Sequence, residues 1–114
     1  MSLELEKSMR IISDLVSFCY YEGAEEFEIY LKHNADESTK MRVSCRIEQM
    51  EPDKVEEIRQ MLRIPRQHEV EQDYWELSGE TEFSGELALV GAMSDRAEVT
   101  YKDEKLCIKV YRDD

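Results

Sequence analysis

The hydrophobic residues of this chain recur at spacings that predict a series of helices and strands. Over residues 3–22 they recur every three or four positions, with Glu and Lys on the opposite side, as in an amphipathic helix. Gly23 follows directly, and glycine ends helices readily because it adopts the left-handed conformation at low cost. We therefore expect a long helix that ends at Gly23. Its apolar positions are Leu5, Met9, Ile11, Ile12, Leu15, Val16, Phe18 and Cys19.

Two alternating segments follow this helix and predict a pair of strands. Phe27, Ile29 and Leu31 alternate with polar residues, so the first strand should have one buried and one wet face. The polar segment 34–38 predicts the loop of a hairpin. The apolar positions of the second strand are Met41, Val43, Cys45 and Ile47.

A second, shorter helix is expected after this hairpin. Pro52 suits its first turn, where the missing N–H costs nothing, and Pro65 stops it. Val55, Ile58 and Leu62 recur between them at helical spacing. They predict the face that this helix buries.

The last third of the chain predicts a loop, a third helix and a second hairpin. Residues 66–82 mix polar residues with isolated aromatic ones, and we assign them only as a loop or lid. A third helix is expected over about residues 84–93, with a serine as its N-cap. Residues 97–100 and 106–111 alternate as strands do, on either side of a polar turn at 102–105.

The order of elements is therefore α-β-β-α-loop-α-β-β in a single domain over residues 1–114. Because each strand offers one apolar side, we expect an α+β fold. It should be a two-layer sandwich with a mixed or antiparallel sheet and the helices on one face. The opposite face of the sheet should be wet or used for association.

Charge and hydropathy restrict the partners and the location. The net charge of −12 opposes approach to nucleic acid or to an anionic membrane surface. No apolar run is long enough to span a bilayer, and the first residues lack the pattern of a signal peptide. We expect a cytoplasmic protein whose partner is another protein, which includes the possibility of a homodimer.

The cysteines and histidines do not form a recognisable site. Cys19, Cys45 and Cys107 are far apart, with apolar neighbours and no C-x-x-C spacing, so we interpret them as reduced thiols of which at least two are buried. His33 and His68 have no helix-spaced carboxylate or thiol partner, and no metal is predicted.

Aromatic pairs offer a possible contact surface. Tyr20–Tyr21 and Tyr74–Trp75 could each place one ring inward and one outward. Inward rings need no ligand, whereas exposed Tyr or Trp residues are typical of protein interfaces.

Three segments carry a resemblance to a known superfamily. Residues 14–23 end the first helix with a glycine, residues 48–53 follow a strand, and residues 84–89 open the third helix as Ser-Gly-Glu-Leu-Ala-Leu. In this order they resemble the motifs of the ATP-binding domain of the histidine-kinase, gyrase, Hsp90 and MutL superfamily. The resemblance covers most of the chain.

The resemblance implies a magnesium-ATP site whose residues are altered here. Phe18 stands at the metal-binding Asn of the family, where an aromatic ring offers no oxygen to the cation, and Asp14 could substitute one turn earlier or be an ordinary aspartate. Glu48 is the nearest candidate for the adenine-binding Asp, or else a solvated carboxylate. Gly85 and Leu87 match the phosphate-binding box, but Glu86 adds a negative charge there.

These departures make a non-catalytic module our first hypothesis for the function. The resemblance implies a regulatory or protein-interaction role in bacterial-type signalling, as in two-component sensor kinases and anti-sigma factors. The departures from its motifs lead us to expect no catalytic residues and no cofactor. The alternative is an enzyme, a divergent sensor histidine kinase or anti-sigma-factor kinase domain that still binds ATP and magnesium. A third possibility is an unrelated small α+β binding domain.

Overall fold

The structure is a computed structural model, and it describes residues 3–36, 38–63, 87 and 90–113. The expectations for the loop at 66–82, for the Ser84 cap and for Gly85 lie outside these residues. The elements are α1 (Leu3–Tyr21), β1 (Glu25–His33), β2 (Thr39–Arg46), α2 (Pro52–Leu62), β3 (Arg96–Lys102) and β4 (Lys105–Arg112). Leu87 and residues 90–92 are also helical and precede β3.

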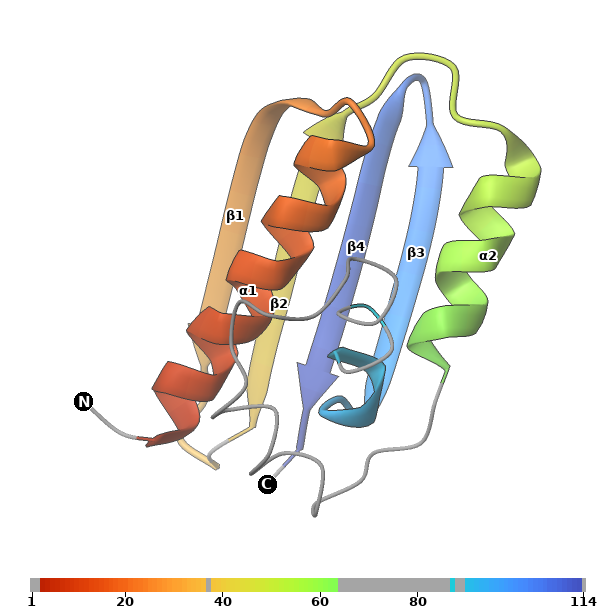
Figure 1. Cartoon of the computed structure of the whole chain (residues 1–114). Helices are drawn as coiled ribbons and strands as arrows, with labels where there is room; N and C mark the ends of the chain where they lie inside the picture. The colour runs from red at the N-terminus through yellow and green to blue at the C-terminus, as the bar shows by residue number, and fades with distance from the viewer. Residues whose placement is uncertain (1–2, 37, 64–86, 88–89, 114) are drawn as a thin grey trace.

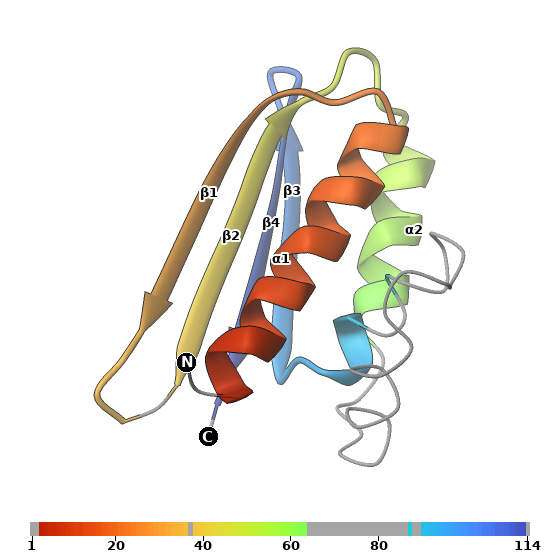
Figure 2. The ribbon, with the colours of Figure 1, turned by 60° about the vertical axis from the view of Figure 1, so that its left-hand side comes forward.

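The four strands form one antiparallel sheet in the order β1-β2-β4-β3. Helices α1 and α2 both lie on one face of this sheet, as the two views of the ribbon show (Figures 1 and 2). The predicted two-layer α+β fold is confirmed, with an antiparallel rather than a mixed sheet.

The first helix ends where glycine was expected to end it. Gly23 has φ +94°, and its N–H donates to the carbonyl of Tyr20 at 3.0 Å. The N–H of Ala24 donates to the carbonyl of Cys19, also at 3.0 Å. These two bonds define a Schellman motif, which reverses the chain and sends it into β1.

The second hairpin is as tight as its polar turn predicted. β3 and β4 pair up to Lys102 opposite Lys105, so only Asp103 and Glu104 form the loop. Both have positive φ, 52° and 64°, as the central residues of a type I′ turn do. This turn matches the right-handed twist of the strands, although glycine is the usual choice for its second central position.

The core lies between the sheet and the helices and confirms most of the apolar positions. Alternate residues of β2 and β4 point into it, as do the predicted faces of α1 and α2. One expectation is wrong: β1 was expected to bury its apolar face, yet Ile29 remains 54% exposed. The reason is that β1 forms the edge of the sheet. The fully buried aliphatic side chains include Ile11, Leu15, Met41, Val43, Ile58, Val90, Leu106, Ile108 and Val110.

The helical segment before β3 packs closely on α2 through Gly91. A Cβ atom at this position would lie 2.9 Å from the Met61 carbonyl oxygen and 3.2 Å from the Leu62 backbone. Both neighbours are backbone, so neither can move aside as a flexible side chain could. Glycine is therefore required for this close approach.

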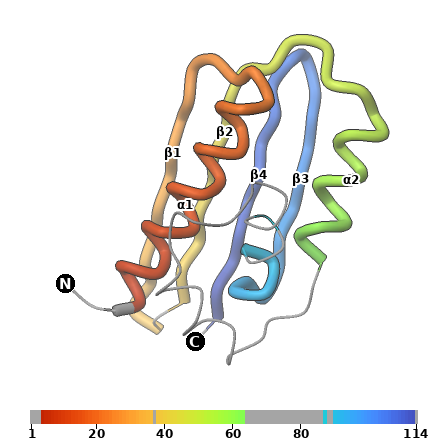
Figure 3. The backbone as a smooth tube through the Cα atoms, in the orientation of Figure 1, coloured from red at the N-terminus to blue at the C-terminus, as the bar shows by residue number. Residues whose placement is uncertain are grey.

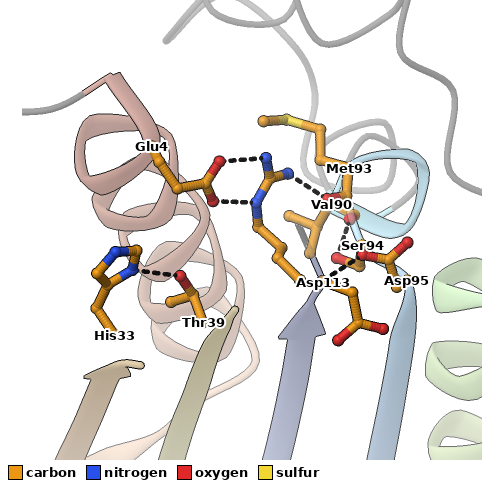
Figure 4. A network of polar contacts seen from close by, with 9 residues as sticks. Glu4, His33, Thr39, Val90, Met93, Ser94, Asp95 and Asp113 are labelled. Carbon is orange, nitrogen blue, oxygen red and sulfur yellow. Dashed lines mark hydrogen bonds and ion pairs between the residues drawn. The ribbon is translucent and has the colours of Figure 1, made fainter. Parts of the chain in front are cut away.

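The start of α1 and the end of β4 lie at the same end of the sheet, as the backbone trace shows (Figure 3). Arg112 connects them, although its side chain is only 1% exposed. Its Nε and Nη2 donate to the two carboxylate oxygens of Glu4 at 2.6 and 2.9 Å, and its Nη1 donates to the Met93 carbonyl. In Figure 4, Glu4 and Met93 face one another across this network.

Candidate functional site

Phe18, which the resemblance aligns with a metal-binding Asn, belongs to the core. Phe18 is buried between α1 and the sheet, and the Lys54 ammonium lies 5.8 Å from the centre of its ring. Asp14, the proposed substitute one turn earlier, is also buried, with its carboxylate 3.5 Å from Nε of Arg10. Both positions are therefore engaged with neighbouring side chains of the fold.

The adenine candidate lies elsewhere. Glu48 follows β2, is exposed, and has its carboxylate 3.7 Å from the Arg46 guanidinium. Glu48 lines a shallow pocket of about 220 Å³ together with Glu22, Lys54 and the other residues of the loop 47–51. Glu22 lies in the same pocket as Glu48, and Asp14 precedes Glu22 by about two helical turns, or about 12 Å. The structure therefore does not bring the carboxylates of Asp14 and Glu48 together.

The phosphate-box residues are described only in part. Leu87 is 1% exposed and belongs to the hydrophobic core. Gly85 lies outside the described residues.

The thiols are free, and two are buried, as predicted. Cys19 on α1 and Cys45 on β2 are both buried, and Cys107 is half-buried. A hydrogen bond between Cys19 and Cys45, together with burial, raises the pKa of the Cys19 thiol. A raised pKa lowers the thiolate fraction, so the reactivity of Cys19 towards thiol reagents should be low.

Metal-binding chemistry finds no support in the described part of the chain. Among those residues, no three His, Cys, Asp or Glu side chains are close enough to hold a metal ion. His33 shares a hydrogen bond of 3.0 Å with Thr39 Oγ1, across the β1–β2 pair, which is a structural role (Figure 4).

An apolar groove runs between α1 and β1. It has a volume of about 470 Å³ and opens at the side of the molecule where Met9 and Ile29 are 50% and 54% exposed. Tyr20 and Tyr21, at the end of α1, are both exposed, so the expectation of one inward ring in this pair is wrong. The groove is lined by Met9, Ile12, Ser13, Val16, Ser17, Ile29 and Leu31.

The outer face of the sheet is basic although the molecule is acidic. The residues that alternate with the core positions of the strands point away from the helices and include eight Lys or Arg residues against three Glu residues. Eight of the 15 basic residues of the chain thus share one face. They are Lys32, Lys40, Arg42, Arg46, Arg96, Lys102, Lys105 and Lys109, and the acidic residues among them are Glu25, Glu28 and Glu98.

Two tyrosines lie among these basic residues. The Arg42 guanidinium lies 5.1 Å from the centre of the Tyr30 ring, and the Arg96 guanidinium lies 4.1 Å from that of Tyr111. Lys40 also lies over Tyr111, at 5.7 Å. These cation–π contacts hold the long cationic side chains against the sheet and keep the charge concentrated there.

The net charge of −12 gave no indication of this basic face, because a sum over the whole chain does not say where the charges lie. The signal is present in the sequence, because basic residues occupy three of the four outer positions of β2 (Lys40, Arg42 and Arg46) and two of the four outer positions of β4 (Lys105 and Lys109). Combining strand alternation with charge sign would have found it.

Comparison with known proteins found no relative. No family model matches the chain, and neither a curated protein nor a solved structure matches it. Among the described residues, no helix is long and apolar enough to cross a membrane.

Proposed function

We propose that this chain is a non-catalytic regulatory module of the cytoplasm, related to the ATP-binding domain of histidine kinases, that binds an acidic segment of a protein partner in a signalling system. The observation that carries the proposal is the concentration of eight cationic side chains on the outer face of the sheet of a molecule with a net charge of −12.

The positions of the nucleotide candidates support a binding role without ATP. Phe18 packs in the core where the family places a magnesium ligand, and Asp14 is paired with Arg10 beside it. Glu48 lies at the surface, close to Arg46. A working site would need the metal and adenine groups to converge on one ligand, whereas each of these side chains has a different environment.

The charge distribution favours an acidic protein segment over nucleic acid. A long polyanion on the sheet would also extend past the acidic remainder of the molecule, which repels it over about 10 Å at moderate ionic strength. An extended acidic peptide of about eight residues spans about 26 Å, roughly the length of one strand, and stays on the basic face.

The test is fluorescence anisotropy with a labelled, Glu-rich peptide of about this length. We expect saturable binding that weakens as salt is raised from about 50 to 300 mM, because exposed charge pairs are screened. Replacing Arg42 and Lys109 together by Gln, at the centre of the face, should lower the affinity about tenfold. The matched control is Arg63→Gln, which removes an exposed positive charge from the helical side and should leave the affinity unchanged.

Three outcomes would overturn the proposal. The first is no saturable binding at low salt, and the second is an equal loss of affinity in the Arg63 variant. The third is tighter binding of a thymidine oligonucleotide of matched charge, which would assign the face to nucleic acid. Calorimetric titration with Mg-ATP tests the kinase alternative, since a site tighter than about 0.1 mM would restore it.

A further inference from the structure

The two edges of the sheet differ in what covers them. At the β3 edge, Arg59 of α2 donates a hydrogen bond from its Nε to the Val99 carbonyl at 3.1 Å, so a side chain occupies a backbone acceptor there. Helix α2 lies along this edge in Figure 1. At the other edge, β1 pairs with β2 alone among the described strands. An exposed strand edge offers its backbone groups to a further strand.

The open edge is continuous with the apolar groove. Ile29 and Leu31 of β1 form one wall, and α1 forms the other from Met9 to Ser17. A partner that added a strand beside β1 would therefore also bury apolar side chains of α1. Backbone pairing and hydrophobic burial would then act at the same interface.

The sequence of β1 is complementary to itself. In the segment Glu28-Ile29-Tyr30-Leu31-Lys32, reversal about Tyr30 places Glu28 opposite Lys32 and Ile29 opposite Leu31. Opposite charges and apolar pairs directly across two antiparallel strands are stabilising. Two copies paired in this way would form both charge pairs on the outer face and both apolar pairs on the helical face.

We infer that the chain forms a homodimer in which the β1 strands of two copies pair antiparallel about a twofold axis at Tyr30. The helix residues that line the groove are centred on Ser13, just as the strand residues are centred on Tyr30. One axis can therefore pass through both centres and bring the two α1 helices alongside each other. The small side chain of Ser13 permits this close helix contact.

An irregularity in β1 fixes where this pairing stops. The register with β2 shifts between Glu25 and Glu28, and Glu26 has φ +56°. Such a bulge bends the strand and interrupts its ladder. The five residues of the self-complementary segment all lie beyond it, so the regular part of the edge and the complementary sequence coincide. Glu28 and Lys32 of this interface also belong to the outer face proposed above to bind an acidic segment, whereas the apolar groove lies on the helical side of the sheet.

Sedimentation velocity on the intact chain, at about 1 to 100 µM, tests the inference with a charge-swap series. The wild type should sediment as a particle of twice its mass of 13.5 kDa. Glu28→Lys brings two positive charges together at both symmetric positions, and Lys32→Glu brings two negative charges together there. Each single variant should weaken dimerisation about thirtyfold, if each of the two pairs loses about 1 kcal/mol. The double variant E28K/K32E restores complementarity and should recover the wild-type dissociation constant within about threefold.

Two controls separate this interface from general effects of charge. Lys102→Glu reverses an exposed charge on β3, the opposite edge strand, and should leave the dimer unchanged. Glu28→Lys also removes the exposed ion pair in which the Glu28 carboxylate lies 3.4 Å from Lys105 Nζ. The free energy of unfolding of each variant, measured in urea, shows how much this loss changes the stability of the monomer. A monomeric wild type at 100 µM would overturn the inference and assign the groove to a different protein. A dimer that both single variants leave intact, or that the double variant fails to restore, would also overturn it.

Discussion

Replacing Arg112 by Met tests how much of the stability depends on the buried connection between α1 and β4. Methionine keeps an apolar stem of similar length in the same space. It removes the two hydrogen bonds to Glu4, at 2.6 and 2.9 Å, and the bond to the Met93 carbonyl. The change is therefore confined to the polar contacts of a side chain that is 1% exposed.

The expected loss follows from the burial of each partner. The Met93 carbonyl loses a donor in a buried setting, which costs about 1–3 kcal/mol. The side chain of Glu4 is 32% exposed, so water can replace part of its lost partner, and we assign about 1 kcal/mol to the ion pair. Arg112→Met should therefore lower the free energy of unfolding by about 2–4 kcal/mol, a large share of the roughly 5–15 kcal/mol typical of a domain.

A double-mutant cycle followed by urea unfolding, with circular dichroism as the signal, separates the pair from its surroundings. Glu4→Gln leaves the guanidinium without that carboxylate, and because arginine stays charged, the loss should equal or exceed that of Arg112→Met. The double variant should lose about 1–3 kcal/mol less than the sum of the two. Lys109→Met, on the outer face of the same strand, is the control and should change stability by under about 0.5 kcal/mol. A loss below about 1 kcal/mol for Arg112→Met, or additive effects, would refute the reasoning.

Three further changes have expected outcomes. Tyr101→Phe removes a hydroxyl that donates a hydrogen bond to the Ile47 carbonyl, just after β2, at 2.6 Å. Urea unfolding should therefore show that the free energy of unfolding falls by about 1–2 kcal/mol. Gly91→Ala places a methyl group 2.9 Å from the Met61 carbonyl oxygen and should lower the melting temperature, whereas an unchanged value would show that α2 can shift. The hydrogen bonds from Ser38 lower the pKa of Asp36 from its ordinary value of 3.8, so their stabilisation is present above pH 3.8 and is lost as the pH falls through the folded-state pKa. NMR titration should show the Asp36 carboxyl titrating below 3.8, and a midpoint at or above this value would contradict the assignment.

The sequence pattern correctly predicted those features of the helices that depend only on neighbouring residues. The spacing of Val55, Ile58 and Leu62 predicted the buried face of α2, and Gly23 predicted the end of α1. In both cases the physical cause, helical periodicity or the freedom of glycine at positive φ, lies within a few residues.

Features that depend on distant segments were not predictable in this way. Alternation identified the apolar side of β1, but only the strand order shows that this strand is at an edge and that Ile29 stays exposed. The burial of Arg112 depends on Glu4, which lies at the other end of the sequence.

For the candidate site, sequence reasoning supplied residue types without their positions in space. The resemblance nominated Asp14 and Glu48, and their separation appears only once α1 and the end of β2 are placed. The groove was missed because no single segment forms it. One wall comes from a helix and the other from a strand that the chain reaches after a turn.

The hydrogen bond from Arg59 to Val99 also bears on the behaviour of the protein at high concentration. A sheet with two open edges can add copies without limit, because each added copy presents a fresh edge. A sheet with one open edge cannot, since the first pairing uses that edge on both molecules and leaves only covered ones outside. The cover that Arg59 and the rest of α2 place along β3 would thus limit edge pairing through β1 to a finite particle instead of a growing fibril.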